Sequence, residues 1–219
     1  MSLTIQPGFA VPFAHARLAG ADALNAALAR LILSLEQQGD AHRNTTALVH
    51  QPDGLFESDF EFFARPEPEV AELRTFCWSA LNELIRSVNA AFDGATRPQL
   101  RIASHTWFHV TRTGGYFGYH NHPMASWSGV YCVASEPRPG VTNDGALVFP
   151  SPLPGANAYM DVANSTLKWP YSHGNYAIDL VPGQLVLFPS WLSHYVTPYG
   201  GSSPRITVAF NAWFAADPA

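Results

Sequence analysis

Residues 119–133, YHNHPMASWSGVYCV, combine two histidines with an apolar segment that alternates as a β-strand does. Residues i and i+2 of a strand share one face, and their Cα atoms lie roughly 6.5–7 Å apart. His120 and His122 can therefore converge on one cation at the bond length of about 2.0–2.2 Å that is typical of metal–nitrogen bonds. The alternative is a surface turn in which both imidazoles are solvated and Pro123 ends the segment. Taken alone, the pair favours the surface turn.

The strand-like period continues through the second half of the chain. Seven or eight short β-branched and aromatic runs, separated by Gly and Pro clusters, include LRIASHTWFHVTR, SGVYCVA, GALVFP, YAIDL, QLVLFP, HYVTP and RITVAFNAWF. This spacing is typical of a sandwich or barrel and not of βαβ units. Residues 150–175 form one long connection without a clear pattern, a length that is common for lids and binding loops.

The first hundred residues carry a helical period instead. Two amphipathic segments, residues 20–38 and 67–92, are separated by residues 44–64, which have the pattern of a strand or loop with a Pro-Asp-Gly turn. Asp22 is well placed to start the first helix, and Gly94 to end the second. The apolar positions of the two segments are Leu24, Leu28, Leu31 and Leu35, and Val70, Leu73, Cys77, Leu81, Leu84 and Val88.

These periods together predict a mainly β protein: a double-stranded β-helix (jelly roll) with two N-terminal helices packed on one sheet. We expect a single domain over residues 1–219. In it, residues 1–99 form a helical support region and residues 100–214 form the jelly-roll catalytic core.

Composition excludes several classes of protein. Charged residues make up only 13% of the chain and apolar residues 47%, which argues against disorder. Lys and Arg number 12 against 17 Asp and Glu, without a basic stripe, so nucleic-acid binding is disfavoured. No apolar stretch reaches the roughly 18 residues that a membrane span needs. The N-terminus has no secretory pattern, and Cys77 and Cys132 are expected to be free and buried, so we expect a cytoplasmic protein.

A third histidine follows in residues 181–194, VPGQLVLFPSWLSH. A Pro-Gly turn starts an apolar strand, a Pro-Ser break follows, and His194 begins the next segment. That segment is predicted to lie beside the strand that carries His120 and His122. Two ligands from one strand and one from a distant strand give a facial set, which leaves three adjacent positions of an octahedral ion open for catalysis.

An arginine then enters the apolar run RITVAFNAWF at position 205. It could be an edge-strand arginine that snorkels or pairs with an acid. The functional interpretation is that the planar guanidinium of Arg205 binds a carboxylate beside the metal with two hydrogen bonds. Thr207 shares its face at i+2 and can add a hydroxyl hydrogen bond to that carboxylate.

The order HNHP, SGVYCV, GALVFPSP, PGQLVLFPSWLSH and RITVAFN resembles the iron(II)- and 2-oxoglutarate-dependent oxygenase superfamily over residues 100–214. It is most similar to a branch of small oxygenases of largely unassigned substrate with a His-x-His-Pro…Ser-Gly-Val-Tyr signature. The resemblance implies that His120 and His194 are iron ligands. It also implies that Arg205 binds the distal carboxylate of 2-oxoglutarate, with Thr207 beside it.

One position departs from the superfamily, which usually has His-x-Asp or His-x-Glu. Here the second position is His122. Three neutral imidazoles leave the iron with its full charge of two, which the 2-oxoglutarate dianion could balance. A three-histidine set is also the pattern of iron dioxygenases that use no oxoacid. Asp144 is an alternative source of a carboxylate ligand, ranked below His122.

Further residues are candidates for the walls of the pocket. His105, Trp107 and His109 share one face of their predicted strand and could line it, although satisfied core or cleft histidines are the favoured interpretation. Tyr131 is predicted as an additional cosubstrate contact, because a buried tyrosine hydroxyl usually finds a partner.

We therefore predict a non-haem Fe(II)- and 2-oxoglutarate-dependent dioxygenase that uses dioxygen and hydroxylates a small organic substrate, with its metal at His120, His122 and His194. One alternative is a three-histidine, cupin-like dioxygenase that oxidises a chelating substrate without an oxoacid. The other is a non-catalytic jelly-roll binding module in which the histidines are incidental.

Overall fold

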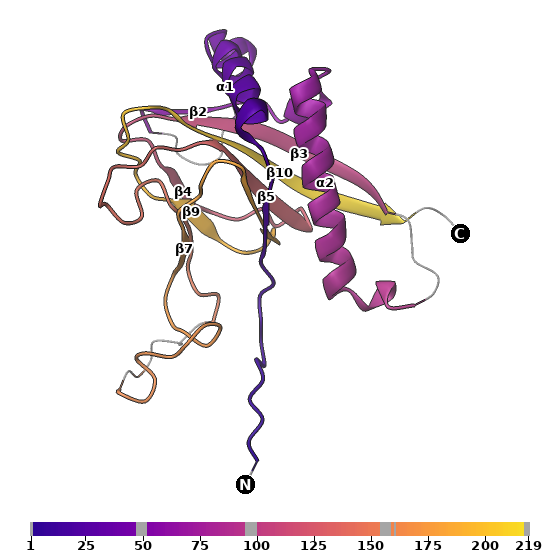
Figure 1. Ribbon diagram of the computed structural model, residues 1–219, viewed down its shortest axis with the longest axis vertical. Coiled ribbons are helices and arrows are strands. Elements are labelled where there is room, and N and C mark those ends of the chain that lie inside the picture. Colours follow the sequence, from indigo (N-terminus) through magenta and orange to yellow (C-terminus); the bar gives the residue numbers. More distant parts are fainter. Residues whose placement is uncertain (1, 47–51, 95–99, 154–158, 160, 217–219) are drawn as a thin grey trace.

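The computed structural model describes residues 2–46, 52–94, 100–153, 159 and 161–216. Within them, ten strands form two antiparallel sheets, and two long helices lie outside one of the sheets (Figure 1). Eight of the strands follow one another from Leu100 onward, as the period-two runs predict. The jelly roll with two N-terminal helices is confirmed.

The larger sheet has six strands and carries the helices. Its order is β1 (Ala14–Arg17), β8 (Gln184–Pro189), β5 (Trp127–Ala134), β10 (Arg205–Ala216), β3 (Leu100–Thr111) and β2 (Leu55–Glu57). The smaller sheet has the order β4 (Phe117–His120), β9 (His194–Val196), β6 (Leu147–Phe149) and β7 (Tyr176–Ile178). From β3 to β6, and again from β7 to β10, consecutive strands of the chain alternate between the two sheets, which gives the wound topology of a jelly roll.

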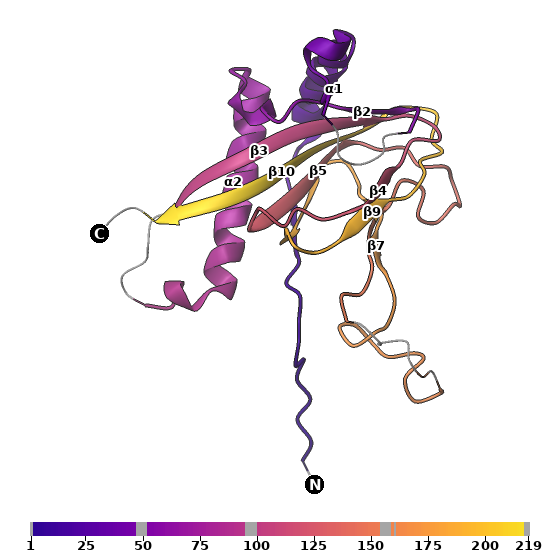
Figure 2. The ribbon, with the colours of Figure 1, turned by 180° about the vertical axis from the view of Figure 1, so that it is seen from behind.

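Two helices, α1 (Asp22–Glu36) and α2 (Pro68–Val88), cover the outer face of the six-stranded sheet, as both views show (Figures 1 and 2). Three single 3₁₀ turns accompany them: η1 (Gly39–Ala41), η2 (Phe62–Ala64) and η3 (Ala90–Phe92). Both predicted helices are confirmed, and so is the turn at residues 52–54, but α2 ends at Val88 and not near Gly94, because the chain leaves the helical conformation at Asn89 and continues as η3. Residues 47–51, 154–158 and 160 of the two predicted connections lie outside the described residues.

The helices and the sheet share one apolar core. It joins Leu28 and Leu81 of the helices to Leu187 and Phe210 of the strands, all of which are fully buried. Burying one such side chain stabilises the fold by roughly 1.5–3 kcal/mol. The prediction that Val88 belongs to the core is wrong. This residue is 49% exposed, because it is the last residue of α2.

The buried positions of α1 differ from the predicted pattern at one place. Ile32, and not Leu31, is the fully buried residue of the middle turn of α1, while Leu31 packs at the edge of the core. Cys77 and Cys132 are both free and buried, as expected. Among the helices that the structure describes, none is long and apolar enough to cross a membrane.

A second core fills the space between the two sheets, with Cys132, Leu147, Val186 and Phe188 at its centre. Alternation along β3 and β10 decides which other side chains enter this space. Phe108, Val110, Val208 and Phe210 belong to the core under the helices. The residues between them therefore point to the interior of the roll, which is where the site is built.

Candidate active site

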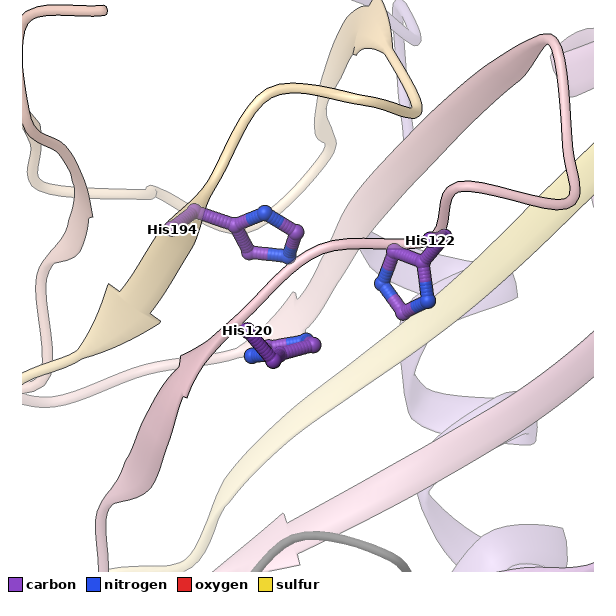
Figure 3. A group of neighbouring side chains, drawn as sticks. All are labelled: His120, His122 and His194. Carbon is purple, nitrogen blue, oxygen red and sulfur yellow. The ribbon is translucent and has the colours of Figure 1, made fainter.

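Three histidines meet between the sheets. His120 is the last residue of β4, and it lies opposite His194, the first residue of β9, in the antiparallel ladder. His122 lies two residues beyond the end of β4, where its backbone N–H donates to the Ser190 carbonyl at 2.9 Å. One nitrogen of each ring lies within 4.8 Å of the others. Figure 3 shows the three rings turned toward a common point.

The predicted convergence is therefore observed, with a different local cause for one member. The sequence pattern predicts that His120 and His122 lie on one strand. The observed strand β4 ends at His120, so His122 lies beyond it. The turn that follows holds it instead, through the bond to Ser190 and the bond from the Ala125 N–H to the His122 carbonyl at 3.0 Å.

Backbone carbonyls orient two of the three rings. Nδ1 of His120 lies 2.7 Å from the Gly118 carbonyl, and Nδ1 of His194 lies 3.0 Å from the Leu192 carbonyl. A proton on each Nδ1 satisfies these carbonyls and leaves Nε2 with a free lone pair. This is the usual arrangement of histidines that bind a metal, in which the second nitrogen fixes the tautomer.

Burial keeps the three imidazoles neutral. It lowers the pKa of His120, lowers the pKa of His122 to about 4, and lowers the pKa of His194 well below its ordinary value. Repulsion between the rings adds to the effect at His122 and His194. Neutral imidazoles are lone-pair donors near pH 7, which is the form that binds a metal.

The donor set fits a divalent transition metal. Imidazole suits Fe(II), Zn(II), Cu(II) and Ni(II), and three imidazoles on one side of an ion leave the other side open to further ligands. The described residues place no carboxylate in this cluster of potential ligands. A metal held here would therefore keep its full charge and favour anionic partners.

Asp144, the alternative carboxylate, is used elsewhere. It accepts hydrogen bonds from the backbone N–H and Nε of Arg138, at 2.8 and 3.0 Å, and from the Gly200 N–H at 2.5 Å. Burial acts to raise its pKa, but these bonds and the charge of Arg138 outweigh it and lower the pKa. Asp144 thus holds two loops together and is not one of the converging ligands.

The three histidines line a cavity between the sheets, here called the inner cavity. Its walls also include Phe117, Leu147, Phe188, Val196, Arg205 and Thr207. Arg205, at the start of β10, is 3% exposed, and none of the described carboxylates lies within ion-pair distance of its guanidinium. Burial lowers its pKa. A buried cation without a counter-ion is costly, so the position suits an anionic ligand.

Tyr131 is not brought to this site. Ser128 and Cys132 of β5 face the interior of the roll, so the alternation along the strand turns Tyr131 to the opposite side. There its hydroxyl donates to Oδ1 of Asn25 on α1 at 2.8 Å, and its ring packs on Phe76 of α2. The predicted cosubstrate contact is therefore replaced by a contact between sheet and helices.

A second cavity, here called the outer cavity, adjoins the first and has a volume of about 460 Å³. It shares His120 and His122 with the inner cavity. Its other described walls are Asn44, Thr46, Glu57, Phe60, His105, Trp107, His109, Phe117, Asn121 and Asn211. His105, Trp107 and His109, the three pocket candidates on β3, thus line it.

Sequence reasoning missed Glu57. This residue lies opposite His109 in the ladder between β2 and β3, and its Oε2 is 2.9 Å from Nε2 of His109. Asn44 donates to Oε1 at 2.5 Å. Burial acts to raise the pKa of Glu57, but the bonds and charge of His109, with the Asn44 bond, lower it. A strand of three residues gives too little pattern to fix such a register from sequence.

Comparisons with known proteins agree with this architecture. Residues 105–211 match the model of a family described as "Putative 2OG-Fe(II) oxygenase". No curated protein matches the sequence.

Solved structures share the fold at low sequence identity. A prolyl-4-hydroxylase from Pseudomonas putida has a TM-score of 0.58 at 15% identity and covers 92% of both chains. AviO1 from Streptomyces viridochromogenes has a TM-score of 0.58 at 20% identity and covers 95% of this chain and 91% of its own. HygX from Streptomyces hygroscopicus, solved with nickel, 2-oxoglutarate and hygromycin B bound, has a TM-score of 0.54 at 11% identity, covering 92% of this chain and 82% of its own.

Proposed function

We propose that this chain is a 2OG-Fe(II) oxygenase, because residues 105–211 match the model of that family, whose members use Fe(II) and 2-oxoglutarate. In this proposal His120, His122 and His194 hold the iron. Arg205 and Thr207 bind the distal carboxylate of 2-oxoglutarate. The proposed reaction is hydroxylation of a small organic substrate. The alternative of a non-catalytic module is set aside by the family match.

The observation that carries this proposal is the position of Arg205. Its buried guanidinium lines the same cavity as the three histidines and has no described carboxylate as counter-ion. Charge-assisted hydrogen bonds between a guanidinium and a carboxylate are strong, and their geometry is specific. A dicarboxylate that spans from Arg205 to the metal would therefore satisfy both buried cations at once.

The oxidation, in which 2-oxoglutarate, dioxygen and a substrate C–H bond give succinate, carbon dioxide and an alcohol, would be supplied by iron when it is bound. The residues of the chain bind and orient the reactants. The three imidazoles would hold the iron, and the cosubstrate would complete its ligand set. Thr207 lies two residues from Arg205 on the same face of β10, so its hydroxyl can donate to the same carboxylate. The apolar walls Phe117, Leu147 and Phe188 exclude water.

The test is release of succinate from 2-oxoglutarate in the presence of Fe(II) and ascorbate. We expect turnover in the natural protein, loss of turnover in His194→Ala, and a large increase in the half-saturating concentration of 2-oxoglutarate in Arg205→Ala. Two matched controls should behave as the natural protein. One is His15→Ala on β1, and the other is Arg112→Ala, which removes a surface ion pair with Glu36. Iron-loaded protein that neither turns over nor binds 2-oxoglutarate contradicts the proposal.

The all-histidine triad supports one second candidate, a dioxygenase that oxidises a chelating substrate directly. Arg205 would then bind the carboxylate of that substrate. The two functions differ in their requirement for an oxoacid. Oxygen consumption with a substrate present and no 2-oxoglutarate would favour the second candidate.

A further inference from the structure

Asn211 presents an amide donor to both cavities. Its Oδ1 accepts a hydrogen bond from the Ser128 hydroxyl at 2.7 Å, and that hydroxyl lies 2.8 Å from the hydroxyl of Ser190. This buried network fixes the orientation of the amide, with its NH₂ group turned away from Ser128. Asn211 is 9% exposed and lines both cavities, so its Nδ2 lies on their common wall.

The Nδ2 atom of Asn211 is accessible and has no acceptor in the part of the chain that the structure describes. Among the described residues, the buried side-chain nitrogen and oxygen atoms without a partner are Glu67 Oε2, Trp107 Nε1 and His173 Nε2. Nδ2 of Asn211 makes no hydrogen bond to the described chain, yet it is not one of these buried atoms. It is therefore an unpaired donor at the surface of the cavities, and a molecule that enters them can accept a hydrogen bond from it.

His105 lies beside Asn211. The two residues are directly opposite in the ladder between β3 and β10, which places their Cβ atoms about 4.5–5.5 Å apart on one face. The His105 ring lines the outer cavity, where Phe60 stacks on it at 6.0 Å. Neither ring nitrogen is among the buried atoms without a partner, and neither bonds to the described chain. Because a neutral imidazole has one acceptor nitrogen, the two residues offer a donor and an acceptor side by side.

The metal site separates these two residues from the anchor for the cosubstrate. Arg205 lies six residues before Asn211 on β10, which corresponds to roughly 20 Å along a strand. Trp107 lies two residues from His105 toward the Arg205 end of the sheet, and its ring is 5.7 Å from that of His122. The distal carboxylate of 2-oxoglutarate would be held at the Arg205 end. Asn211 and His105 therefore face the other ligand of the site, the substrate.

The outer cavity suits an uncharged molecule. Among its described walls, Glu57 is the only ionisable carboxylate and there is no Lys or Arg. The Glu57 carboxylate is already bound by His109 and Asn44, so it does not call for a cationic ligand. The volume of about 460 Å³ is in the range of sites for small organic ligands, and its aromatic walls favour planar molecules.

We propose that the substrate is an uncharged aromatic molecule with a planar amide group, whose carbonyl oxygen accepts a hydrogen bond from Nδ2 of Asn211 and whose N–H donates to the ring of His105. This inference rests on the proposed function, because it assigns the outer cavity to the substrate of that same metal site. Asn211 and His105 act as specificity contacts: they select the molecule and set its orientation toward the metal.

The test compares four probes of similar shape. Benzamide carries both the carbonyl and the N–H, acetophenone only the carbonyl, ethylbenzene neither, and benzoate a charge. Their dissociation constants are measured by ligand-observed NMR on the full chain, both alone and loaded with Zn(II) and 2-oxoglutarate, so that no turnover is needed.

Two variants each remove one contact. Asn211→Leu keeps the size of the side chain and removes the donor, and His105→Phe keeps a ring and removes the nitrogens. Asn175→Leu and His15→Phe are matched controls at exposed positions outside the outer cavity. The side-chain NH₂ signals of the ¹⁵N-labelled natural protein report on Asn211 directly.

We expect benzamide to bind about three- to tenfold more tightly than acetophenone, and acetophenone about three- to tenfold more tightly than ethylbenzene, one step for each hydrogen bond. Asn211→Leu should bring the second ratio close to one, and His105→Phe the first. The two controls should keep both ratios, and benzoate should bind most weakly. The NH₂ signals of Asn211 should move with benzamide and acetophenone but not with ethylbenzene, a result that does not depend on the folding of any variant.

The inference is overturned if the three neutral probes bind equally, if none binds, if benzoate binds best, or if each variant keeps both ratios. It is also overturned if 2-oxoglutarate displaces benzamide or binds more weakly to Asn211→Leu, because Asn211 would then contact the cosubstrate. Probe binding to the protein alone does not depend on succinate release, so failure of this inference is distinguishable from failure of the proposed function.

Discussion

His120 and His194 lie directly opposite each other in the ladder between β4 and β9, with their ring centroids 4.3 Å apart. The backbone pairing that closes the smaller sheet therefore also sets the spacing of two candidate ligands. Because the register of a strand with one buried face is strongly specified, this spacing exists before any ion binds. The third ring, of His122, is added by the turn after β4.

The triad should bind metal as one unit. We expect His122→Ala to weaken the binding of Fe(II) by roughly 100-fold or more, since the loss of a mere outer-shell partner already costs about 10–100-fold. Anaerobic equilibrium dialysis with metal analysis measures the affinity. In a thermal melt, Fe(II) should raise the melting temperature of the natural protein and of the control His15→Ala, but not that of His122→Ala. Unchanged iron affinity in His122→Ala would mean that a two-histidine site suffices.

Arg205 is expected to destabilise the fold when no anion is bound, because its buried guanidinium then has no counter-ion. Replacing this buried guanidinium by the apolar side chain of similar length in Arg205→Met should raise the free energy of unfolding by about 1–2 kcal/mol in the absence of 2-oxoglutarate. The same variant should bind no 2-oxoglutarate in calorimetry. Urea denaturation with and without the oxoacid measures both effects. A destabilised Arg205→Met would indicate that the guanidinium has an internal structural role.

The convergence of the three histidines could be predicted because each stands beside a strong local signal. His120 and His122 precede Pro123, and His194 follows a Pro-Ser break after an apolar strand. Such signals mark the ends of strands, and in a jelly roll the strand ends of one sheet lie close together. Their role as ligands remains a prediction.

Other parts of the site depend on facts that the sequence does not contain. Tyr131 is one position out of phase with Ser128 and Cys132, and an alternating strand with two buried faces gives no sign of which face meets the metal. Glu57 reaches His109 only through the register of a three-residue strand. The unpartnered N–H of Trp107 is likewise visible only once the surrounding walls are in place.

Gly145 should be required for the position of Arg205. Its φ of 73° is rare for other residues, and an added Cβ would lie 2.8 Å from Cδ2 of Tyr199 and 3.1 Å from Cδ of Arg205. We expect Gly145→Ala to lower the free energy of unfolding by about 2–4 kcal/mol, the sum of backbone strain and overpacking. Gly114→Ala is the matched control, since its φ is 86° but nothing lies within 4 Å of the new atom.

The free energy of unfolding of the control Gly114→Ala should therefore fall by only about 1–2 kcal/mol, the cost of backbone strain alone. Chemical denaturation measures the free energy of unfolding of both variants. Calorimetry with 2-oxoglutarate reports whether Arg205 still binds the oxoacid. We expect weaker binding of 2-oxoglutarate in Gly145→Ala and unchanged binding in Gly114→Ala. Equal losses of stability in the two variants would show that Tyr199 and Arg205 move aside without cost.

The bonds of Glu57 should give the protein a stability that depends on pH. Because its pKa is lowered in the folded state, its contribution is complete above the ordinary value of 4.5 and is lost as pH falls through the lowered value. We expect Glu57→Gln to reduce the free energy of unfolding by about 1.5–3 kcal/mol at pH 7, the usual worth of a charged hydrogen bond. The difference from the natural protein should shrink progressively below pH 4.5.

Urea denaturation between pH 3 and pH 7 measures this difference directly. Glu83→Gln, on the exposed side of α2, is the matched control and should change the free energy of unfolding by at most about 0.5 kcal/mol. A Glu57→Gln effect that stays constant over the whole range would mean that the side chain contributes through packing and not through its charge. The bond to His109 would then be replaceable by a neutral amide, and Glu57 would have no electrostatic part in holding that ring beside the outer cavity.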